Sequence, residues 1–407
     1  MVNSYKELIN IIKNQQETMV DQLHQFCEIN SGTTNLPGLS SMLEVLQNAF
    51  NPLADSIERK KLPPLPIVNM NGNSIEQSFG DALFIRKRSH LKRRILLGGH
   101  MDTVYTAAHP FQKLTYLNDN EINGPGVADM KGGLIVMLHA LAAFEQTDFA
   151  DELGWDVFIN SEEEIGSPAS SLVFDELASD YQAALIYEPA MNATGTLAKN
   201  RKGSGKLTLI ATGKSAHAGR DFHAGRNAIC YLAQAILAVH ALNGLRDGVT
   251  INVGKIAGGE ALNVVPDKAV AQLDVRISAP EDEFWVRAEL GKIINQFKHK
   301  DYALTVHGGF GRPVKQVCAG TKRLFNRICT IGQQLGLSID WKDSGGCCDG
   351  NNLAKHGLPV LDTLGVRGGN IHSAEEFIVV DSLSERATLS ALLLVDLSQG
   401  GLEDLKK

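Results

Sequence analysis

The sequence predicts an α/β protein with a mainly parallel sheet, helices on both faces of that sheet, and an inserted ferredoxin-like α+β domain. Two observations predict this fold class. Strand-length apolar runs alternate with helix-length segments up to residue 199 and again from residue 312. Between them the order changes to β-α-β-β-α-β, the pattern of a unit that can fold by itself. We therefore expect one domain from residues 1–199 and 312–407, and an inserted domain from residues 200–311.

The first domain shows the alternation element by element. Its first thirty residues carry apolar side chains near helical spacing, from Leu8 to Phe26, and predict one amphipathic helix. A strand at 82–85 and a strongly apolar strand ending at Gly99 follow. The other predicted elements before the insertion are a helix at 131–144, a strand at 155–160, a helix at 167–177 and a strand at 183–187. After the insertion we expect a helix at 322–335, a strand at 359–364 and a helix at 383–397.

The inserted domain has its own order of elements. Its predicted elements are a strand at 206–212, a helix at 226–242, strands at 250–255 and 270–277, a helix at 281–297 and a strand at 303–307. The chain passes between the two domains near residues 199–203 and 311–314. If the domains move relative to one another, these two crossings must bend.

Composition excludes several classes of function. The net charge of -7 is mild, so a nucleic-acid partner, which normally requires a basic surface, is not expected. No apolar run approaches the roughly 18 residues of a membrane span, so no membrane partner is expected. The amino terminus lacks the pattern of a secretory leader. The six cysteines are scattered, which indicates reduced thiols and a cytoplasmic location.

Polar side chains gather where predicted strands end. His100 and Asp102 follow the strand that ends at Gly99, and Glu188 follows the strand at 183–187. Ligands of open α/β sheets bind beyond the carboxyl ends of the strands, so we expect these side chains to face one site. Asp102 is spaced to hydrogen-bond the second imidazole nitrogen of His100, as carboxylates do beside metal-bound histidines.

Three more segments extend this pattern. Asp129 lies in a Gly-rich approach to a predicted helix, where a helix cap is the simpler interpretation. Glu163 and Glu164 follow a buried strand, where a solvated acidic turn is the alternative. His372 lies in a Gly-rich loop after another strand.

Taken together, these residues supply two imidazoles and several carboxylates, which suit zinc in a catalytic site. Their number exceeds what one ion needs, so two metals about 3.5–4 Å apart are the economical interpretation. One carboxylate would bridge the metals and another would stay free as a base. A phosphate-binding loop and a dinucleotide fingerprint both fit poorly, because the required Lys-Ser/Thr ending and glycine spacing are missing.

Five motifs, in this order, carry a resemblance to a known family. They are His100-Met101-Asp102, Gly-Val-Ala-Asp129-Met-Lys-Gly-Gly, Glu162-Glu163-Glu164-Ile-Gly-Ser, Tyr187-Glu188-Pro189 and His372-Ser373. The chain resembles the dinuclear zinc aminoacylase and carboxypeptidase superfamily over nearly its whole length. Members include glutamate carboxypeptidase, acetylornithine deacetylase, succinyl-diaminopimelate desuccinylase and dipeptidases, and the glutamate carboxypeptidase branch is the most similar in these motifs.

The resemblance implies two Zn²⁺ per subunit, with Co²⁺ or Mn²⁺ as alternatives. His100 and Glu188 would hold one ion, Glu164 and His372 the other, and Asp129 would bridge both.

Two catalytic roles and one backbone feature are implied as well. Glu163 would be the general base that takes a proton from the attacking water, and Asp102 would orient His100. The resemblance also implies that the Asp129–Met130 peptide bond is cis.

In the inserted domain, the resemblance implies a homodimer and a substrate site. His217 would donate to the oxyanion in the partner subunit's site. Arg276 and Asn263 would bind a free carboxylate of the substrate, as the paired donors of a guanidinium suit; a structural salt bridge is the alternative for Arg276. Cys347 and Cys348 depart from the family pattern, and small buried side chains are the simplest interpretation.

The sequence thus predicts a metal-dependent hydrolase that cleaves an amide or peptide bond next to a free carboxylate. A glutamate-carboxypeptidase-like exopeptidase is the leading interpretation. An N-acyl amino acid deacylase and a dipeptidase remain open within the same class, with an acyl-amino acid or peptide as substrate. A non-catalytic peptide or metabolite binder is the alternative of another class, and thiol-based catalysis a remote third.

Overall fold

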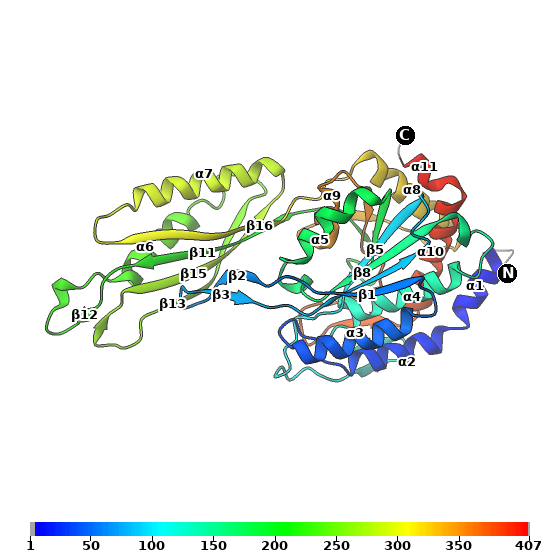
Figure 1. Ribbon diagram of the computed structural model, residues 1–407, viewed down its shortest axis with the longest axis horizontal. Helices are drawn as coiled ribbons and strands as arrows, with labels where there is room; N and C mark the ends of the chain where they lie inside the picture. Colours follow the sequence, from blue (N-terminus) through cyan, green and yellow to red (C-terminus); the bar gives the residue numbers. More distant parts are fainter. Residues whose placement is uncertain (1–4, 406–407) are drawn as a thin grey trace.

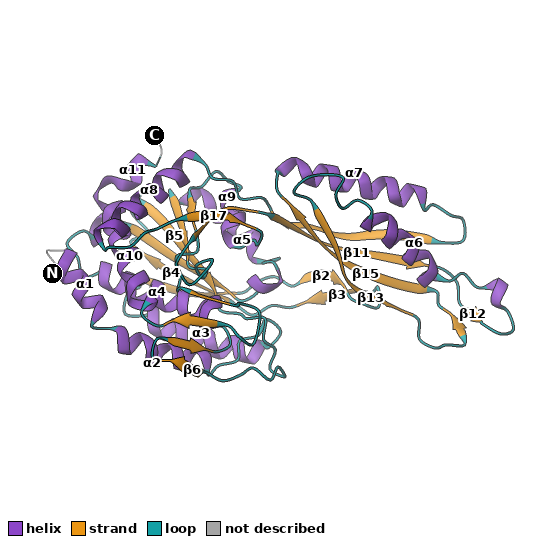
Figure 2. Ribbon diagram, turned by 180° about the vertical axis from the view of Figure 1, so that it is seen from behind, coloured by secondary structure: helices purple, strands orange, loops and turns teal. Residues whose placement is uncertain are grey.

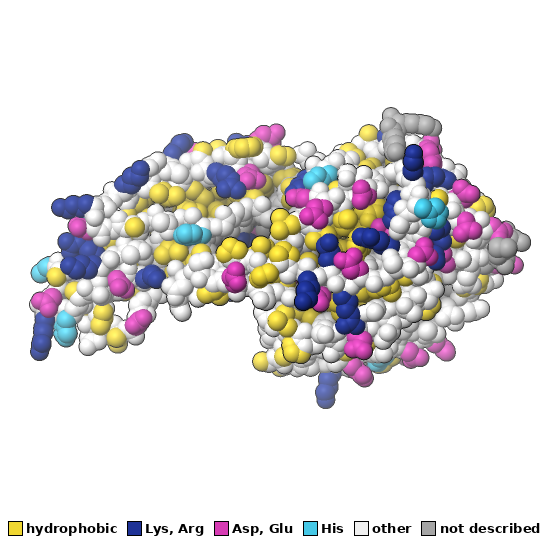
Figure 3. All heavy atoms as spheres, in the orientation of Figure 1, with side chains coloured by type: hydrophobic (Ala, Val, Ile, Leu, Met, Phe, Trp, Pro, Cys, Tyr) yellow, Lys and Arg dark blue, Asp and Glu magenta, His cyan; other side chains and the backbone are white. Residues whose placement is uncertain are grey.

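The computed structural model describes residues 5–405. It is an elongated molecule made of two units (Figure 1), with a notch between them on one long side (Figure 3). The larger unit, the main domain, contains both ends of the described chain, far from the second unit (Figure 1). The second unit, which we call the inserted domain, comprises the strands and helices from Gly203 to Arg312.

A mainly parallel sheet forms the centre of the main domain, in the strand order β1-β4-β8-β5-β9-β18. The pairs β8/β5, β5/β9 and β9/β18 are parallel, whereas β1/β4 and β4/β8 are antiparallel. The strand bounds are Ser56–Lys60 (β1), Ala82–Lys87 (β4), Arg94–His100 (β5), Gly154–Asn160 (β8), Ala183–Ile186 (β9) and Val360–Leu361 (β18). The predicted parallel core is therefore present, with an antiparallel edge.

Helices cover both faces because the central strands are apolar on both sides. Leu97 and Val157 face the larger core, while Leu96 and Phe158 face the smaller one. The larger core is covered by α1 (Tyr5–Lys13), α2 (Gln16–Cys27), α3 (Leu36–Phe50), α4 (Gly132–Phe144), α8 (Ala319–Gln334) and α10 (Ser382–Asp396). The smaller core is covered by α5 (Ser170–Leu177) and α9 (Asp349–Ala354). The last helix of the described residues is α11 (Leu402–Asp404).

One segment of this core is long and apolar enough, by length and composition, to cross a membrane. It runs from Val127 to Phe144, and 94% of it is buried inside the fold. The sequence analysis expected no apolar run of this length. The segment packs against α10, α1 and α2 as the core helix of the main domain.

The inserted domain is a four-stranded antiparallel sheet with two helices on one face (Figure 2). Its strand order is β13-β15-β11-β16, which the β-α-β-β-α-β succession produces. The bounds are Gly203–Thr212 (β11), Ala228–His240 (α6), Thr250–Gly258 (β13), Lys268–Ile277 (β15), Pro280–Gln296 (α7) and Ala303–Arg312 (β16). A separate cluster of buried side chains fills this unit.

Smaller sheets complete the fold. A four-stranded sheet has the order β19-β20-β7-β6, and two-stranded sheets pair β10 with β17 and β12 with β14. Their bounds are Thr115–Asn118 (β6), Glu121–Asn123 (β7), Leu197–Arg201 (β10), Ala216–His217 (β12), Val264–Val265 (β14), Trp341–Ser344 (β17), Gly368–Gly369 (β19) and Phe377–Val379 (β20).

Several features differ from the sequence prediction, and α3 and β1 are among the elements that it did not contain. The predicted first helix is two helices, because the chain breaks at Asn14 and Gln15. The predicted strand at 359–364 is only two residues long. A hairpin formed by β2 (Leu65–Val68) and β3 (Ser74–Gln77) was not predicted.

This hairpin extends from the main domain to the sheet of the inserted domain (Figure 1). Gln272 Nε2 donates to the carbonyl of Val68 at 3.4 Å, and Lys268 Nζ donates to Asn73 Oδ1 at 3.3 Å. The hairpin therefore forms a contact between the two domains that is separate from the two chain crossings.

Candidate metal centre

Six side chains meet at the carboxyl ends of β5, β8 and β9. Because these strands are parallel neighbours, the residues that follow them share one edge of the sheet. One further residue reaches this point from the turn before α4, and another from the loop between β19 and β20. We call the set the carboxylate–histidine cluster: His100, Asp129, Glu163, Glu164, Glu188 and His372.

Asp129 lies at the centre of the cluster, and each of its oxygens faces a different imidazole. Oδ1 lies 3.1 Å from His100 Nε2, and Oδ2 lies 3.2 Å from His372 Nε2. His372 Nε2 is also 3.1 Å from Glu164 Oε2, and His100 Nε2 is 3.8 Å from Glu188 Oε1. The cluster thus divides into two sets that share Asp129: His100 with Glu188, and His372 with Glu164.

The spacing of these atoms suits metal coordination. Two ligands of a tetrahedral zinc ion with bonds of about 2.05 Å lie about 3.3 Å apart, and the contacts above span 3.1 to 3.8 Å. Glu164 Oε1 and Glu188 Oε1 are buried and have no hydrogen-bond partner among residues 5–405. Since burying an unpartnered carboxylate oxygen is costly, a bound cation fits both positions. Glu163 also offers an oxygen, within 4.8 Å of ligand atoms of His100 and Glu188.

The electrostatics of the cluster show how strongly it favours positive charge. Hydrogen bonds to Asp129 and Glu164 raise the pKa of His372 to about 11. Burial and the neighbouring Asp129 raise the pKa of Glu164 to about 8. Burial likewise raises the pKa of Glu188 well above its ordinary value, and Asp129 adds to the effect. Burial also acts on Asp129, but its two histidine partners hold the pKa of that carboxyl below its ordinary value. Carboxylates packed this closely require cations beside them.

Asp102, which is completely buried, connects His100 to the turn that carries two of the glutamates. Its Oδ1 and Oδ2 accept from the backbone N–H groups of Glu163 and Glu164, at 3.1 and 3.2 Å, and Thr33 Oγ1 donates to Oδ2 at 2.7 Å. His100 Nδ1 lies 3.0 Å from the backbone carbonyl of Asp102 and 3.4 Å from its Oδ1. The shorter contact to His100 therefore comes from the backbone of Asp102, not from the expected carboxylate.

Glu376 holds the loop around Asp129, and the sequence analysis missed it. Its carboxylate is fully buried and accepts from the N–H groups of Ala128 at 2.9 Å and of Asp129 at 3.0 Å. The hydroxyl of Tyr105 donates to it at 2.7 Å. The available signal was a second acidic pair, Glu375-Glu376, three and four residues after His372. The Asp129–Met130 peptide bond within this loop is cis, as the resemblance implied.

Glu162, the first of the three consecutive glutamates, has a structural role. Its carboxylate accepts from the backbone N–H groups of Ala169 and Ser170, at the start of α5. The other two members of the run face the cluster.

The predicted residues of the inserted domain lie elsewhere. His217 is exposed on β12, which lies at the end of the inserted domain farthest from the main domain (Figure 1). Asn263 is beside it, because its carbonyl accepts from Ala218 N–H at 2.9 Å. The structure therefore does not bring these two residues to the cluster of their own chain.

Arg276 lies between these two regions, near the end of β15. Its Nε donates to Asp274 Oδ1 at 2.6 Å, and its Nη1 lies 3.3 Å from Cys347 Sγ. The guanidinium thus makes a salt bridge inside its own domain and a contact with the main domain. Cys348 is buried and packs in the smaller core.

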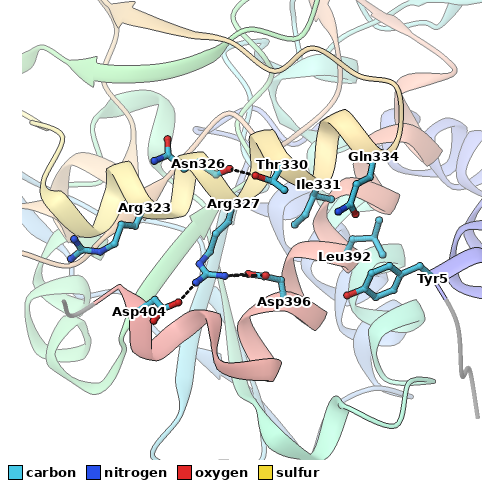
Figure 4. Close-up of a pocket in the computed structure, with 10 residues that line it drawn as sticks. All are labelled: Tyr5, Arg323, Asn326, Arg327, Thr330, Ile331, Gln334, Leu392, Asp396 and Asp404. Carbon is cyan, nitrogen blue, oxygen red and sulfur yellow. Dashed lines mark hydrogen bonds and ion pairs between the residues drawn. The ribbon is translucent and has the colours of Figure 1, made fainter.

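A hollow of about 410 Å³ lies between α1, α8, α10 and α11 (Figure 4). Arg327 faces into it, and its guanidinium is bound by Asp396 and Asp404. The hollow is at the far end of the main domain from the inserted domain (Figure 1), so it belongs to a different region from the cluster.

Replacing Asp102 by Asn tests how far the backbone contacts matter. The amide nitrogen would face an N–H group of Glu163 or Glu164, so the turn should lose its present position. We expect Zn²⁺ affinity to fall about 10- to 100-fold, measured by competition with a chromophoric chelator. The matched control is Asp119→Asn, in an exposed turn, which should leave affinity unchanged. Equal affinities for Asp102→Asn and wild type would contradict the role of Asp102.

Comparisons with known proteins agree with this geometry. Residues 96–396 match Peptidase family M20/M25/M40. Carboxypeptidase G2 of Pseudomonas sp. (strain RS-16) is 26% identical over 399 residues, which cover 97% of this chain and 92% of the relative. A putative succinyl-diaminopimelate desuccinylase DapE of Mycobacterium tuberculosis (strain ATCC 25618 / H37Rv) is 32% identical over 213 residues, 49% of this chain and 56% of the relative. A tripeptidase from Staphylococcus aureus subsp. aureus mu50 has a similar fold, with a TM-score of 0.72 at 21% identity over 94% of this chain and 99% of that one.

The family match covers well over half of the chain, and the curated relatives are named as a carboxypeptidase and a desuccinylase. The chain belongs to Peptidase family M20/M25/M40 and is a metal-dependent hydrolytic enzyme.

Proposed function

We propose that this enzyme is a di-zinc exopeptidase that cleaves an amide next to a free carboxylate and releases an amino acid. Glutamate is the amino acid that we propose it releases best. The observation that carries the proposal is the shared Asp129, whose two oxygens face two separate histidine–carboxylate sets. The set of His100 and Glu188 would hold one ion, and the set of His372 and Glu164 the other. When bound, such a zinc pair lowers the pKa of water and polarises a carbonyl.

Glu163 is the proposed general base. It is a member of the cluster, but among residues 5–405 it forms no ion pair with His100 or His372, so it would remain free to accept a proton. It would take that proton from the water that attacks the carbonyl carbon and pass it to the nitrogen of the leaving amino acid. Burial raises the pKa of Glu163, and Arg312 opposes that rise.

The substrate class is supported by two considerations. The match to carboxypeptidase G2 extends over almost the whole of both chains. Arg276 and Asn263 are the proposed ligands of the free carboxylate, and Arg276 already points to the junction of the two domains through its contact with Cys347. A substrate carboxylate would share this guanidinium with Asp274.

We further propose a homodimer that assembles through the inserted domain. The strand β13 lies at an edge of its sheet, and apolar side chains are exposed on it and on α6: Leu237 is 69% exposed and Ile256 58%. Exposed apolar patches beside an unpaired strand edge favour association. The strand β12, which contains His217, lies far from the main domain (Figure 1), which fits an oxyanion donor to the partner subunit's site. The six free cysteines suit a reducing compartment such as the cytoplasm.

A panel of substrates tests the activity. It combines N-acetyl, N-benzoyl and N-succinyl derivatives of glutamate, ornithine and leucine with dipeptides, assayed for free amino acid with and without EDTA. We expect release that EDTA abolishes and Zn²⁺ restores, greatest for glutamate derivatives in line with the match to carboxypeptidase G2. Preference for a succinyl group on a basic amino acid would favour the deacylase alternative. No release by zinc-loaded protein would favour a binding function.

Replacing Glu163 by Gln tests the base. The amide keeps the shape of the side chain but cannot accept a proton, so kcat should fall at least 10²- to 10⁴-fold while two Zn²⁺ remain bound. Metal content and turnover are measured on the same sample. The matched control is Glu176→Gln, at an exposed position of α5, which should keep its turnover. Normal turnover by Glu163→Gln would exclude Glu163 as base.

Mixing two inactive variants tests the role of His217. His217→Ala should lose about 10²- to 10³-fold in kcat, as for other oxyanion donors. If His217 acts on the partner subunit, refolding equal amounts of His217→Ala and Glu163→Gln should restore about a quarter of wild-type activity, since half of the dimers then contain one complete site. No recovery in mixtures shown to contain heterodimers would contradict action across subunits.

A further inference from the structure

Arg312 connects the inserted domain to the proposed base. It is the last residue of β16, the strand by which the chain returns to the main domain, and its backbone pairs with Ser204 at the start of β11. Its side chain is only 2% exposed and enters the main domain. One residue thus has its backbone in the sheet of one domain and its guanidinium inside the other.

The guanidinium binds two elements of the main domain at once. Nη2 donates to Glu163 Oε1 at 2.5 Å and to Ser167 Oγ at 3.0 Å. Nη1 donates to Asp349 Oδ1 at 2.5 Å and to Asn352 Oδ1 at 2.8 Å, both on α9. The two terminal nitrogens of the guanidinium form a fork. The fork holds the Glu163 carboxylate in one orientation, because both nitrogens are fixed by their other partners.

Asp349, the partner on α9, is itself held firmly. Its Oδ2 accepts from Asn160 Nδ2 at 2.6 Å, and its Oδ1 accepts from Ser167 Oγ at 2.6 Å. Asp349 and Asn160 are both buried. The position of the Arg312 guanidinium is therefore set by the end of β8 and by α9, and Glu163 is the one partner of the fork that faces the cluster.

Without Arg312, the Glu163 side chain would have no ion-pair partner among residues 5–405 on the side away from the two histidines. Its neighbours there would be the carboxylate of Asp349 and the hydroxyl of Ser167. Removing the guanidinium would leave Glu163 facing a like charge in a buried site, so its carboxylate would be expected to turn away from Asp349.

We propose that Arg312 is a positioning residue that orients the general base Glu163 and links that orientation to the place of the inserted domain. The inference rests on the proposed function of Glu163. It assigns Arg312 no contact with the reacting atoms. Because its backbone belongs to β16, a movement of the inserted domain would be transmitted to the base through one side chain.

Two substitutions at this position separate the proposal from a structural role. In zinc-loaded enzyme, Arg312→Met should lower kcat about 10²-fold, the effect expected when a reacting group is displaced by about 1 Å, while KM changes less than threefold. Arg312→Lys, which keeps the charge, should recover at least a tenth of wild-type kcat. If Arg312→Met fails to fold, Asn352→Ala takes its place in the test. This variant removes one anchor of the guanidinium without touching Glu163, and its kcat should fall about three- to tenfold. The control is Arg287→Met, an exposed arginine on α7 paired with Glu283, which should behave as wild type.

A double variant and a binding measurement complete the test. In the Glu163→Gln background, Arg312→Met should cause no further loss, because its effect passes through the base. Calorimetry with uncleaved benzoyl-glutamate should give the same Kd, within twofold, for Glu163→Gln and for the double variant. A Kd at least tenfold weaker would assign Arg312 to substrate binding instead and overturn the proposal.

The outcomes also distinguish this inference from the proposed function. If Glu163→Gln retains turnover, the base and the role of Arg312 both fail. If Glu163→Gln is inactive, and folded, zinc-loaded Arg312→Met nevertheless keeps wild-type kcat, then only the role of Arg312 fails.

Discussion

The structure depends on keeping four carboxylates together at one edge of a buried sheet. Asp129 is the most constrained of them, because its two oxygens face His100 and His372 and its backbone N–H is bound by Glu376. Like charges at this distance repel strongly in a protein interior. The fold opposes this repulsion in two ways: it places imidazoles beside the carboxylates, and it fixes Asp129, Glu163 and Glu164 through their backbone N–H groups. Binding of cations is the chemical consequence of that arrangement.

The parallel sheet makes such a cluster possible. Neighbouring parallel strands end at the same edge, so single residues after β5, β8 and β9 come together without long loops. Two further acids then stabilise the loops and do not enter the cluster. Asp102 accepts the N–H groups of Glu163 and Glu164, and Glu376 accepts those around Asp129. In both cases a buried carboxylate holds the backbone of a neighbouring acid, so the position of the cluster is determined by main-chain geometry.

The sequence was sufficient to predict this part because the signals are local. An apolar strand followed at once by a His or a Glu identifies a strand end, and each member of the cluster could be found in that way or by its motif. Arg312 carries no such signal: its contact with Glu163 joins residues 149 apart in the chain, and its importance appears only when β16 meets α9. Glu376 is separated from Asp129 by 247 residues for the same reason.

Elsewhere the periodicity itself was misleading. The apolar spacing of the first thirty residues continues from Leu8 to Phe26 through the break at Asn14 and Gln15, so α1 and α2 look like one helix. The β2–β3 hairpin gave no strong pattern because its side chains are mostly exposed or half-buried on both faces. Its position is set by contacts with the inserted domain, which sequence periodicity does not report.

The two chain crossings between the domains show where movement is restricted. Arg201 and Lys315 pair through their backbones, at 2.9 and 3.1 Å, and both side chains bind the fully buried Asp362 at the end of β18. A buried carboxylate with two cationic partners resists separation, because removing either partner would leave a charge uncompensated. The crossings are therefore fixed to the main sheet as far as residues 201 and 315. Any bending is left to the short stretches between these residues and the strands β11 and β16, and one of those stretches begins at Arg312.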